Sequence, residues 1–364
     1  MSNDARSMYS LSVDQCANLI KAVGSKRTVL VEGDMGSGKS TILKTLAKEL
    51  PTHTAAYFDC TTKDLGDISI PHVTAIAEGG YVSYVPNEEF GVHLGKPLIL
   101  MLDELGKANP AVKNALLRVM QERTVGNVPL HPDSIVFATT NKGSEGVGDI
   151  LPPHARNRIA VVRMKKPSNM DWIEWGINNG VDHTLLGWCK DNPHLFHTFD
   201  DYKNPDDNPY IFHPKQQRAA FVTPRSLEAA SDILKARAGM DDMTVTAALM
   251  GTIGDRGAMD LMAFVKLADQ LPSLESIKKS PETAKVPTSA AAVCMVVYRT
   301  LATIEKDWID AWMTYMARLD TEAQGMFANG VRAPKYAKQA MIMTSKTFTQ
   351  WAMAHGWLFS ADKR

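Results

Sequence analysis

The sequence predicts an α/β protein whose core is a parallel, doubly wound sheet, followed by helical segments. Three observations lead to this fold class. Short apolar runs alternate with helical patterns up to residue 166, a glycine-rich turn joins the first run directly to a helix, and strand-like runs fade after Pro167. We therefore expect an α/β core over residues 1–166, a helical lid over 167–272 and a helical C-terminal extension over 273–364.

Short, continuous apolar runs are the expected strands of this sheet. A parallel strand is covered by helices on both faces, so it reads as an unbroken apolar run rather than an alternating one. The runs are Thr28–Glu32, Ala55–Phe58, Leu98–Leu102, Ser134–Ala138 and Ile159–Arg163. Helical patterns that would cover them lie at 13–23, 39–50 and 111–122. A further stretch, Gly79–Pro86, joins a glycine pair to alternating β-formers and predicts a hairpin inserted into the core.

Charge and composition exclude several classes of protein. Lysine plus arginine number 40, as do aspartate plus glutamate, so the formal net charge is zero, whereas a protein that coats duplex nucleic acid carries a basic excess. Hydrophobic residues make up 45% of the chain, which argues against disorder. No apolar run approaches about 18 residues, so no membrane span is expected. The first residues lack a signal-peptide pattern. Four cysteines without a CxxC pair are typical of reduced thiols in a cytoplasmic protein.

The segment Gly33–Ser40, with the sequence GDMGSGKS, fits the pattern G-x-x-x-x-G-K-[ST]. It lies between an expected strand and an expected helix, where glycines let the backbone curl so that successive N–H groups cradle phosphate oxygens. Lys39 would reach the β- and γ-phosphates, and the hydroxyl of Ser40 would bind Mg²⁺. The predicted nucleotide-binding residues are Gly33, Asp34, Met35, Gly36, Ser37, Gly38, Lys39, Ser40 and Thr41.

Polar residues also end the third and fourth apolar runs. Asp103 and Glu104 follow the third run, where Asp103 would hold Mg²⁺ and Glu104 would act as general base on an attacking water. Two adjacent acids suit water activation better than transfer to a bound acceptor, which favours a nucleotide hydrolase over a kinase. Asn141 ends the fourth run and could orient that water, the alternative being a turn-forming asparagine.

The order of these motifs resembles that of the AAA+ ATPases, and within them the MoxR-like branch, over about residues 12–270. The residues that carry the resemblance lie at 33–40, 98–104, 139–141, 155–158 and 223–225, and the hairpin at 80–86 is similar to the insertion that marks the branch. The resemblance implies a P-loop NTPase core that uses ATP and Mg²⁺, with Asn141 in the position called sensor 1.

The resemblance also gives roles to arginines. Arg158 would be the finger that one subunit inserts into its neighbour's site, with Arg156 as the alternative, and Arg225 matches the sensor 2 arginine of a lid helix. Thr223 would cap that helix, with Pro224 at its first position. A guanidinium neutralises charge that develops on the γ-phosphate. A finger from a neighbour implies a closed ring of subunits, and the resemblance implies a hexamer.

The sequence thus predicts an oligomeric, Mg-dependent ATPase that remodels, matures or activates a partner protein in the manner of a chaperone. The resemblance implies a partner with a von Willebrand factor A domain. Two other classes stay open: a nucleic-acid motor or nuclease-associated NTPase, which the neutral charge disfavours, and a nucleotide switch or scaffold with little turnover.

One basic stretch near the C-terminus has two interpretations. No acidic residue occurs between Glu322 and Asp362, whereas basic and aromatic residues interleave there. They are Arg332, Lys335, Lys338 and Lys346 with Tyr336, Phe348, Trp351 and Trp357. The pattern fits a docking face for an acidic partner or nucleic acid. It also fits the solvated side of helices whose aromatic residues lie in the core.

Overall fold

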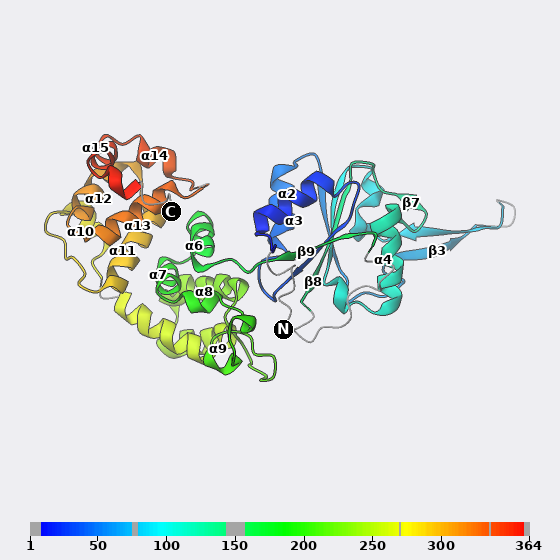
Figure 1. Cartoon of the computed structure of the whole chain (residues 1–364), viewed down its shortest axis with the longest axis horizontal. Coiled ribbons are helices and arrows are strands. Elements are labelled where there is room, and N and C mark those ends of the chain that lie inside the picture. The colour runs from blue at the N-terminus through cyan, green and yellow to red at the C-terminus, as the bar shows by residue number, and fades with distance from the viewer. Residues whose placement is uncertain (1–8, 75–78, 143–156, 269–270, 335, 360–364) are drawn as a thin grey trace. The chain divides into compact units, whose positions relative to one another are not determined.

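The computed structural model describes residues 9–74, 79–142, 157–268, 271–334 and 336–359. The chain forms two compact units, Met1–Lys166 and Pro167–Arg364, which are described separately (Figure 1). Among the described residues, no helix is both long and apolar enough to cross a membrane.

The first unit is built on a five-stranded parallel sheet with the strand order β2-β5-β8-β1-β9. The strands are β1 (Val29–Gly33), β2 (Thr54–Asp59), β5 (Leu98–Asp103), β8 (Ile135–Asn141) and β9 (Ala160–Met164). Each of the five apolar runs in the sequence is one of these strands. The predicted parallel α/β core is therefore confirmed, and the carboxyl ends of β1, β5 and β8 come together at one edge of the sheet.

Helices cover both faces of this sheet. Helices α2 (Val13–Val23) and α3 (Thr41–Glu49) pack on one face and α4 (Pro110–Glu122) on the other (Figure 1). Successive residues of β1 alternate between two hydrophobic clusters, because side chains of a strand point to opposite faces. Val29 and Val31 pack with α2 and α3, whereas Leu30 packs in the cluster that holds Leu116 of α4.

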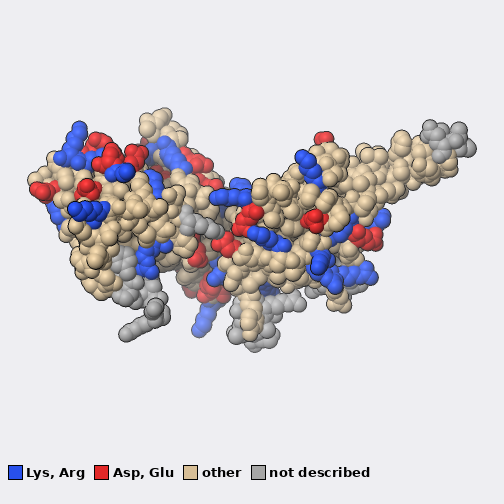
Figure 2. All heavy atoms as spheres, turned by 90° about the horizontal axis from the view of Figure 1, so that it is seen from above, with Lys and Arg blue, Asp and Glu red and all other residues tan. Residues whose placement is uncertain are grey.

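A β-hairpin is inserted between β2 and β5, as the glycine pair predicted. It pairs β3 (Ser69–Val73) with β4 (Val82–Pro86) in antiparallel register. The first of these strands was not among the expected elements, because Pro71 and His72 interrupt its apolar pattern. The hairpin exposes aliphatic and aromatic side chains on an arm that carries little charge (Figure 2). A short second hairpin joins β6 (Thr124–Val125) to β7 (Val128–Pro129).

Helices are the regular secondary structure of the second unit in its described residues. Its helices are α6 (Asn169–Asn178), α7 (His183–Asp191), α8 (Pro224–Ala236), α9 (Asp242–Ala268), α10 (Leu274–Lys279), α11 (Ala290–Thr303), α12 (Ile309–Met316), α13 (Thr321–Arg332), α14 (Gln339–Met343) and α15 (Lys346–Ala354). A long connection with short 3-10 turns, such as Pro193–Phe196, separates α7 from α8. The helical character expected after Pro167 is confirmed.

One hydrophobic core runs through this unit from Trp172 to Phe348. Its members come from both the segment expected as a lid and the segment expected as a separate extension. Helix α11 packs against α7, where an ideal Cβ built on Gly187 would lie 3.1 Å from Cγ of Met295. Tyr298 of α11 belongs to the same core as Leu185 and Val331. The boundary between lid and extension at 272/273 stays a prediction. Because the two segments share one core, deletion of the extension tests whether the lid folds without it.

Removal of residues 273–364 should destroy cooperative folding of residues 167–272. Each buried aliphatic side chain that α11 contributes stabilises the unit by about 1.5–3 kcal/mol, and truncation would expose the helices that pack on it. We expect the truncated chain to lose protection of 167–272 from limited trypsin proteolysis, while residues 1–166 keep a separate urea unfolding transition. A protease-resistant fragment of 167–272 in the truncated chain would contradict this expectation.

Candidate functional site

The phosphate-binding pattern forms a tight turn between β1 and α3. Gly36 and Gly38 adopt positive φ angles of 67° and 93°, a conformation that glycine adopts without steric cost. The hydroxyl of Ser37 donates a hydrogen bond of 2.7 Å to the carbonyl of Asp34 and closes the turn. Ser40 precedes α3, which begins at Thr41. A turn of this kind at the N-terminus of a helix is suited to bind an anion.

The ammonium of Lys39 links this turn to the end of a neighbouring strand. Lys39 is buried, and its Nζ donates to the carbonyls of Gly33 and Asp34 at 3.1 and 2.9 Å and to Oδ1 of Asn141 at 2.7 Å. Gly33 and Asn141 are register partners of the adjacent parallel strands β1 and β8. The sheet itself therefore places Asn141 beside the lysine.

Asp103 ends β5 as a buried carboxylate that several donors surround. Its Oδ2 accepts a hydrogen bond of 2.9 Å from the hydroxyl of Tyr57. Its Oδ1 accepts one from the backbone N–H of Glu104 at 3.1 Å and one from the hydroxyl of Thr139. These bonds hold the carboxylate at the strand end in one orientation.

Glu104 stands directly after the strand in a left-handed conformation with a φ of 53°. This backbone is uncommon for a residue other than glycine, and such conformations cluster at functional sites. The carboxylate of Glu104 forms an ion pair of 3.1 Å with Lys107, which lies one turn further along the chain. Asp103 and Glu104 are thus held in different surroundings, one hydrogen-bonded and buried, the other paired with a lysine.

Three residues of the site lay outside the predicted set. Tyr57 and Thr139 orient Asp103, and Lys142 pairs with the buried carboxylate of Asp34 at 2.8 Å. The signal that could have found Thr139 and Lys142 is their position around the end of the fourth apolar run. For Tyr57 the sequence signal was weak, because it is simply an aromatic residue near the end of an edge strand.

Cys60 lies next to this acidic strand end and is fully buried. Burial, followed by the nearby carboxylates of Asp103, Asp59 and Glu104, raises the pKa of the Cys60 thiol from 9.0 to about 12. Each of these effects disfavours a thiolate. Cys60 is therefore an inert core thiol rather than a nucleophile.

The predicted arginines lie in different places. Arg158 is exposed just before β9, and its Nη1 donates to Oε1 of Gln121 at 2.8 Å. Arg156, the alternative finger, lies outside the described residues. Arg225 is exposed in the second unit, in the first turn of α8. The predicted cap of that helix is confirmed, because the Thr223 hydroxyl accepts from the backbone N–H of Ser226 with Pro224 in the first turn.

The site has groups that fit a nucleotide phosphate and a magnesium ion. The Nδ2 of Asn141 is buried and has no hydrogen-bond partner among the described residues, so a phosphate oxygen or a water could accept from it. Ser40 and Asp103 offer oxygen ligands, which Mg²⁺ prefers. The described part of the chain holds no cluster of three or more His, Cys, Asp or Glu side chains suited to a metal.

Comparisons with known proteins agree with this geometry. A model of the Sigma-54 interaction domain, which is an AAA+ domain, matches residues 8–142. Protein MoxR of Methylorubrum extorquens is 30% identical over 154 residues, which are 40% of this chain and 43% of that protein. Protein MoxR of Paracoccus denitrificans is 31% identical over 136 residues, 36% of this chain and 39% of that protein. The matches thus span about two-fifths of these relatives.

A solved mutant form of RuvB from Thermotoga maritima covers 82% of this chain and 85% of its own, at 14% identity and a TM-score of 0.36.

Burial of the four cysteines predicts both their reactivity and an alkaline loss of stability. Burial raises the pKa of Cys16 and Cys60 from 9.0 to about 12 and also raises the pKa of Cys189 and Cys294. We expect none of the four to react with iodoacetamide at pH 8 in the folded protein, and all to react in urea. Mass spectrometry of tryptic peptides would measure this.

The same shifts fix the sign of the pH dependence. The unfolded chain loses thiol protons near pH 9, whereas the folded chain keeps those of Cys16 and Cys60 up to about pH 12. Their contribution is therefore complete below pH 9 and is lost as the pH rises toward 12, by up to about 1.4 kcal/mol per thiol and pH unit. Urea unfolding of a Cys16→Ala, Cys60→Ala double variant should show a shallower decline. An unchanged slope would refute the assignment.

Proposed function

Because the first unit is an AAA+ ATPase module of the MoxR type, we propose that this chain hydrolyses ATP with Mg²⁺ in a ring of subunits and uses the reaction to remodel a partner protein. The observation that carries the proposal is the contact of Lys39 with Asn141. It joins the phosphate-binding turn to a buried amide that has a donor to spare, at the same sheet edge as Asp103 and Glu104.

Each residue at this edge has a chemical task in the proposed reaction. The backbone of Gly33–Ser40 binds the phosphates, and Lys39 exchanges its carbonyl partners for phosphate oxygens. Glu104 accepts a proton from the attacking water once it leaves Lys107, and Asn141 orients that water through Nδ2. Ser40 and Asp103 would hold Mg²⁺, which neutralises charge on the β- and γ-phosphates when bound. Tyr57 and Thr139 position Asp103 by hydrogen bonds.

An arginine from a neighbouring subunit would complete the site. Arg158 is suited to this task because it is exposed and its hydrogen-bond partner among the described residues is the neutral amide of Gln121, which it can leave at low cost. Arg156 stays the alternative. Arg225, exposed at the start of α8, would sense the γ-phosphate from the second unit. A finger that reaches a neighbour requires a head-to-tail interface, which closes into a ring, and we propose a hexamer.

The charge and the resemblance of the chain bear on its partner. The chain's balanced charge favours a protein client over nucleic acid, and the resemblance to the MoxR-like branch makes a partner with a von Willebrand factor A domain a candidate. Four free, buried cysteines also fit action in the cytoplasm. A nucleic-acid motor stays the alternative function, and it would show itself as binding that weakens steeply with salt.

Replacement of the proposed base tests the chemistry. Glu104→Gln keeps the shape of the side chain but removes the proton acceptor, so we expect ATP turnover to fall by about 10²–10⁴-fold with ATP affinity retained. Glu122→Gln is the matched control, since Glu122 is an exposed carboxylate of the same unit that pairs with Arg118. Phosphate release and equilibrium ATP binding are the measurements. Equal turnover in the two variants would reject Glu104 as the base.

Mixing two inactive variants tests the shared site. We expect Arg158→Ala to lower turnover by about 10³–10⁵-fold while ATP still binds, as for other arginine fingers. A mixture of Arg158→Ala and Glu104→Gln subunits should regain activity, because the second variant supplies its arginine to the intact base of the first. Arg118→Ala is the control for loss of an exposed arginine. Normal turnover of Arg158→Ala would transfer the role to Arg156, and an inactive Arg158→Ala that the mixture does not rescue would contradict a site shared between subunits.

A further inference from the structure

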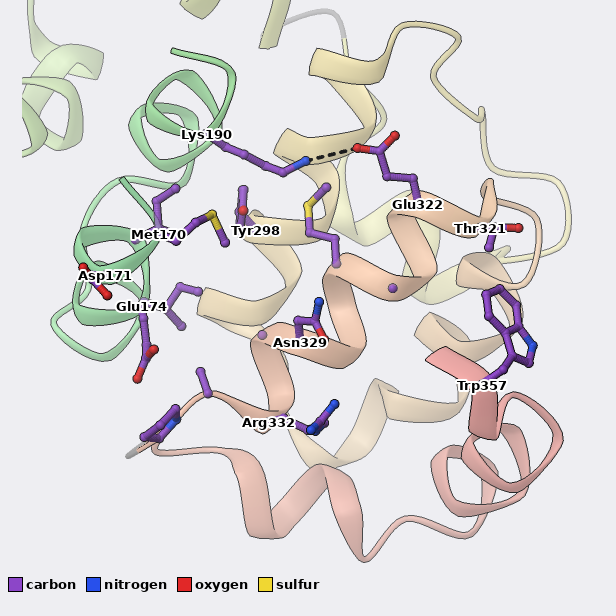
Figure 3. A pocket seen from close by; sticks show the side chains of 17 residues that line it. Met170, Asp171, Glu174, Lys190, Tyr298, Thr321, Glu322, Asn329, Arg332 and Trp357 are labelled. Atoms are coloured by element: carbon purple, nitrogen blue, oxygen red, sulfur yellow. Dashed lines mark ion pairs between the residues drawn. The ribbon is translucent and has the colours of Figure 1, made fainter. Parts of the chain in front are cut away.

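The basic and aromatic stretch near the C-terminus contributes to the core of the second unit. Tyr336 and Phe348 are buried in that core. Trp357 is exposed and lines a cavity of about 900 Å³ in the same unit, where Lys190 and Glu322 form an ion pair of 3.5 Å (Figure 3). The side chain of Glu322 is 80% exposed, and an ion pair with so exposed a member contributes little free energy.

A second ion pair, at the proposed nucleotide site, is far more buried. The carboxylate of Asp34 lies in the phosphate-binding turn with its side chain only 8% exposed. The Nζ of Lys142 lies 2.8 Å from Oδ1 of this carboxylate and donates to Oδ2 at 2.9 Å. A carboxylate taken out of water needs a cation or several donors to offset its lost hydration, and Lys142 supplies the cation here.

The register of the sheet brings these two residues together. Gly33 and Asn141 are partners on the adjacent parallel strands β1 and β8, and Asp34 and Lys142 are the residues that follow them. The two charged residues lie 108 positions apart in the chain, yet they leave the same edge of the sheet next to one another. The pair is therefore fixed by strand register rather than by a meeting of long surface side chains.

The pair completes a ring of contacts around the turn. The carbonyl of Asp34 accepts from Nζ of Lys39 at 2.9 Å, and the same Nζ donates to Oδ1 of Asn141, which precedes Lys142 in the chain. Asp34 thus contacts both lysines, Lys39 through its backbone and Lys142 through its carboxylate. Because Lys142 offsets the charge of that carboxylate, the charge of Lys39 does not have to.

A negative charge inside a phosphate-binding turn opposes the binding of a nucleotide. Phosphate oxygens are negative, and two like charges raise each other's free energy most strongly where water is excluded. Asp34 places such a charge at the second position of the segment Gly33–Ser40. Once Lys142 is paired with it, the two side chains together carry no net charge. The backbone N–H groups and Lys39 then determine what the turn binds.

We propose that Lys142 is a positioning residue of the nucleotide site, which neutralises Asp34 so that the phosphate-binding turn accepts a nucleoside triphosphate. Lys142 acts through Asp34 and does not itself contact the phosphates. Asp34 takes part in binding through its backbone, whereas its carboxylate opposes the phosphates unless it is paired. This inference rests on the proposed function, since it concerns the same site.

Equilibrium binding of the non-hydrolysable analogue β,γ-imido-ATP to the full chain tests this charge compensation. Lys142→Met keeps a long side chain but removes the cation, so we expect the affinity to fall by about tenfold or more, because an unpaired buried carboxylate then faces the phosphates. The double variant Asp34→Asn, Lys142→Met lacks both charges and should bind within about threefold of the wild type. A double variant no better than Lys142→Met would overturn the inference.

The single variant Asp34→Asn separates charge compensation from a purely structural tie. Compensation predicts that Asp34→Asn binds the analogue as tightly as the wild type or more tightly, because Lys142 then adds an unbalanced positive charge. A pair that only holds the turn in place would make Asp34→Asn and Lys142→Met weaken binding alike, and that result would overturn the inference. If melting curves show that Lys142→Met does not fold, the affinity of Asp34→Asn alone decides.

Two further variants and the wild type complete the experiment. Lys142→Arg keeps the charge and should keep the affinity of the wild type. Lys21→Met is the matched control, since Lys21 forms an exposed pair with Glu49 in the same unit and its loss should leave the affinity unchanged. A wild type that does not bind the analogue with Mg²⁺ would overturn the proposed function and this inference with it. Binding by the wild type and equally by Lys142→Met would overturn the inference alone.

Discussion

The buried ammonium of Lys39 is the interaction around which the first unit is organised. A charge taken out of water needs strong acceptors, and here two carbonyls of the glycine-rich turn and the amide oxygen of Asn141 supply them. These acceptors converge only because β1 and β8 run parallel in register, with Gly33 opposite Asn141. The sheet order, the turn and the helix that follows it thus together supply the acceptors that the Lys39 ammonium needs. Phosphate oxygens of a nucleotide can replace these acceptors, so the fold is suited to bind an anion at this place.

The two carboxylates at the end of β5, Asp103 and Glu104, lie in unlike surroundings. Asp103 is fixed by donors from both neighbouring strands, Tyr57 from β2 and Thr139 from β8. The side chain of Glu104 lies outside this set of donors, because its left-handed backbone turns the chain directly after the strand. Neighbouring carboxylates in unlike surroundings are able to divide metal binding from proton transfer.

The strands of the sheet and the polar residues at their ends could be predicted from the sequence. Parallel strands are continuous apolar runs, and their carboxyl ends share one edge of the sheet. That rule predicted that Asp103, Glu104 and Asn141 lie at this edge, and the glycine-rich pattern predicted the position of Lys39. Sequence reasoning missed Tyr57, whose role depends on which strand lies next to β5, and strand adjacency is a tertiary fact. It missed the first strand of the hairpin because its side chains are exposed and follow no apolar alternation. The helices of the second unit were predicted from the sequence. The core that its helices share was not predicted, because packing between helices far apart in the chain leaves no local sequence pattern.

The common core of the helical unit has a mechanical consequence. Helices from α6 to α15 share one hydrophobic interior, with members on both sides of residue 272. Close packing gives such an interior low compressibility, so a push at one end is felt at the other as displacement rather than absorbed as deformation. We therefore expect a displacement of α13 or α15 to be passed on to α8, which carries Arg225 in its first turn.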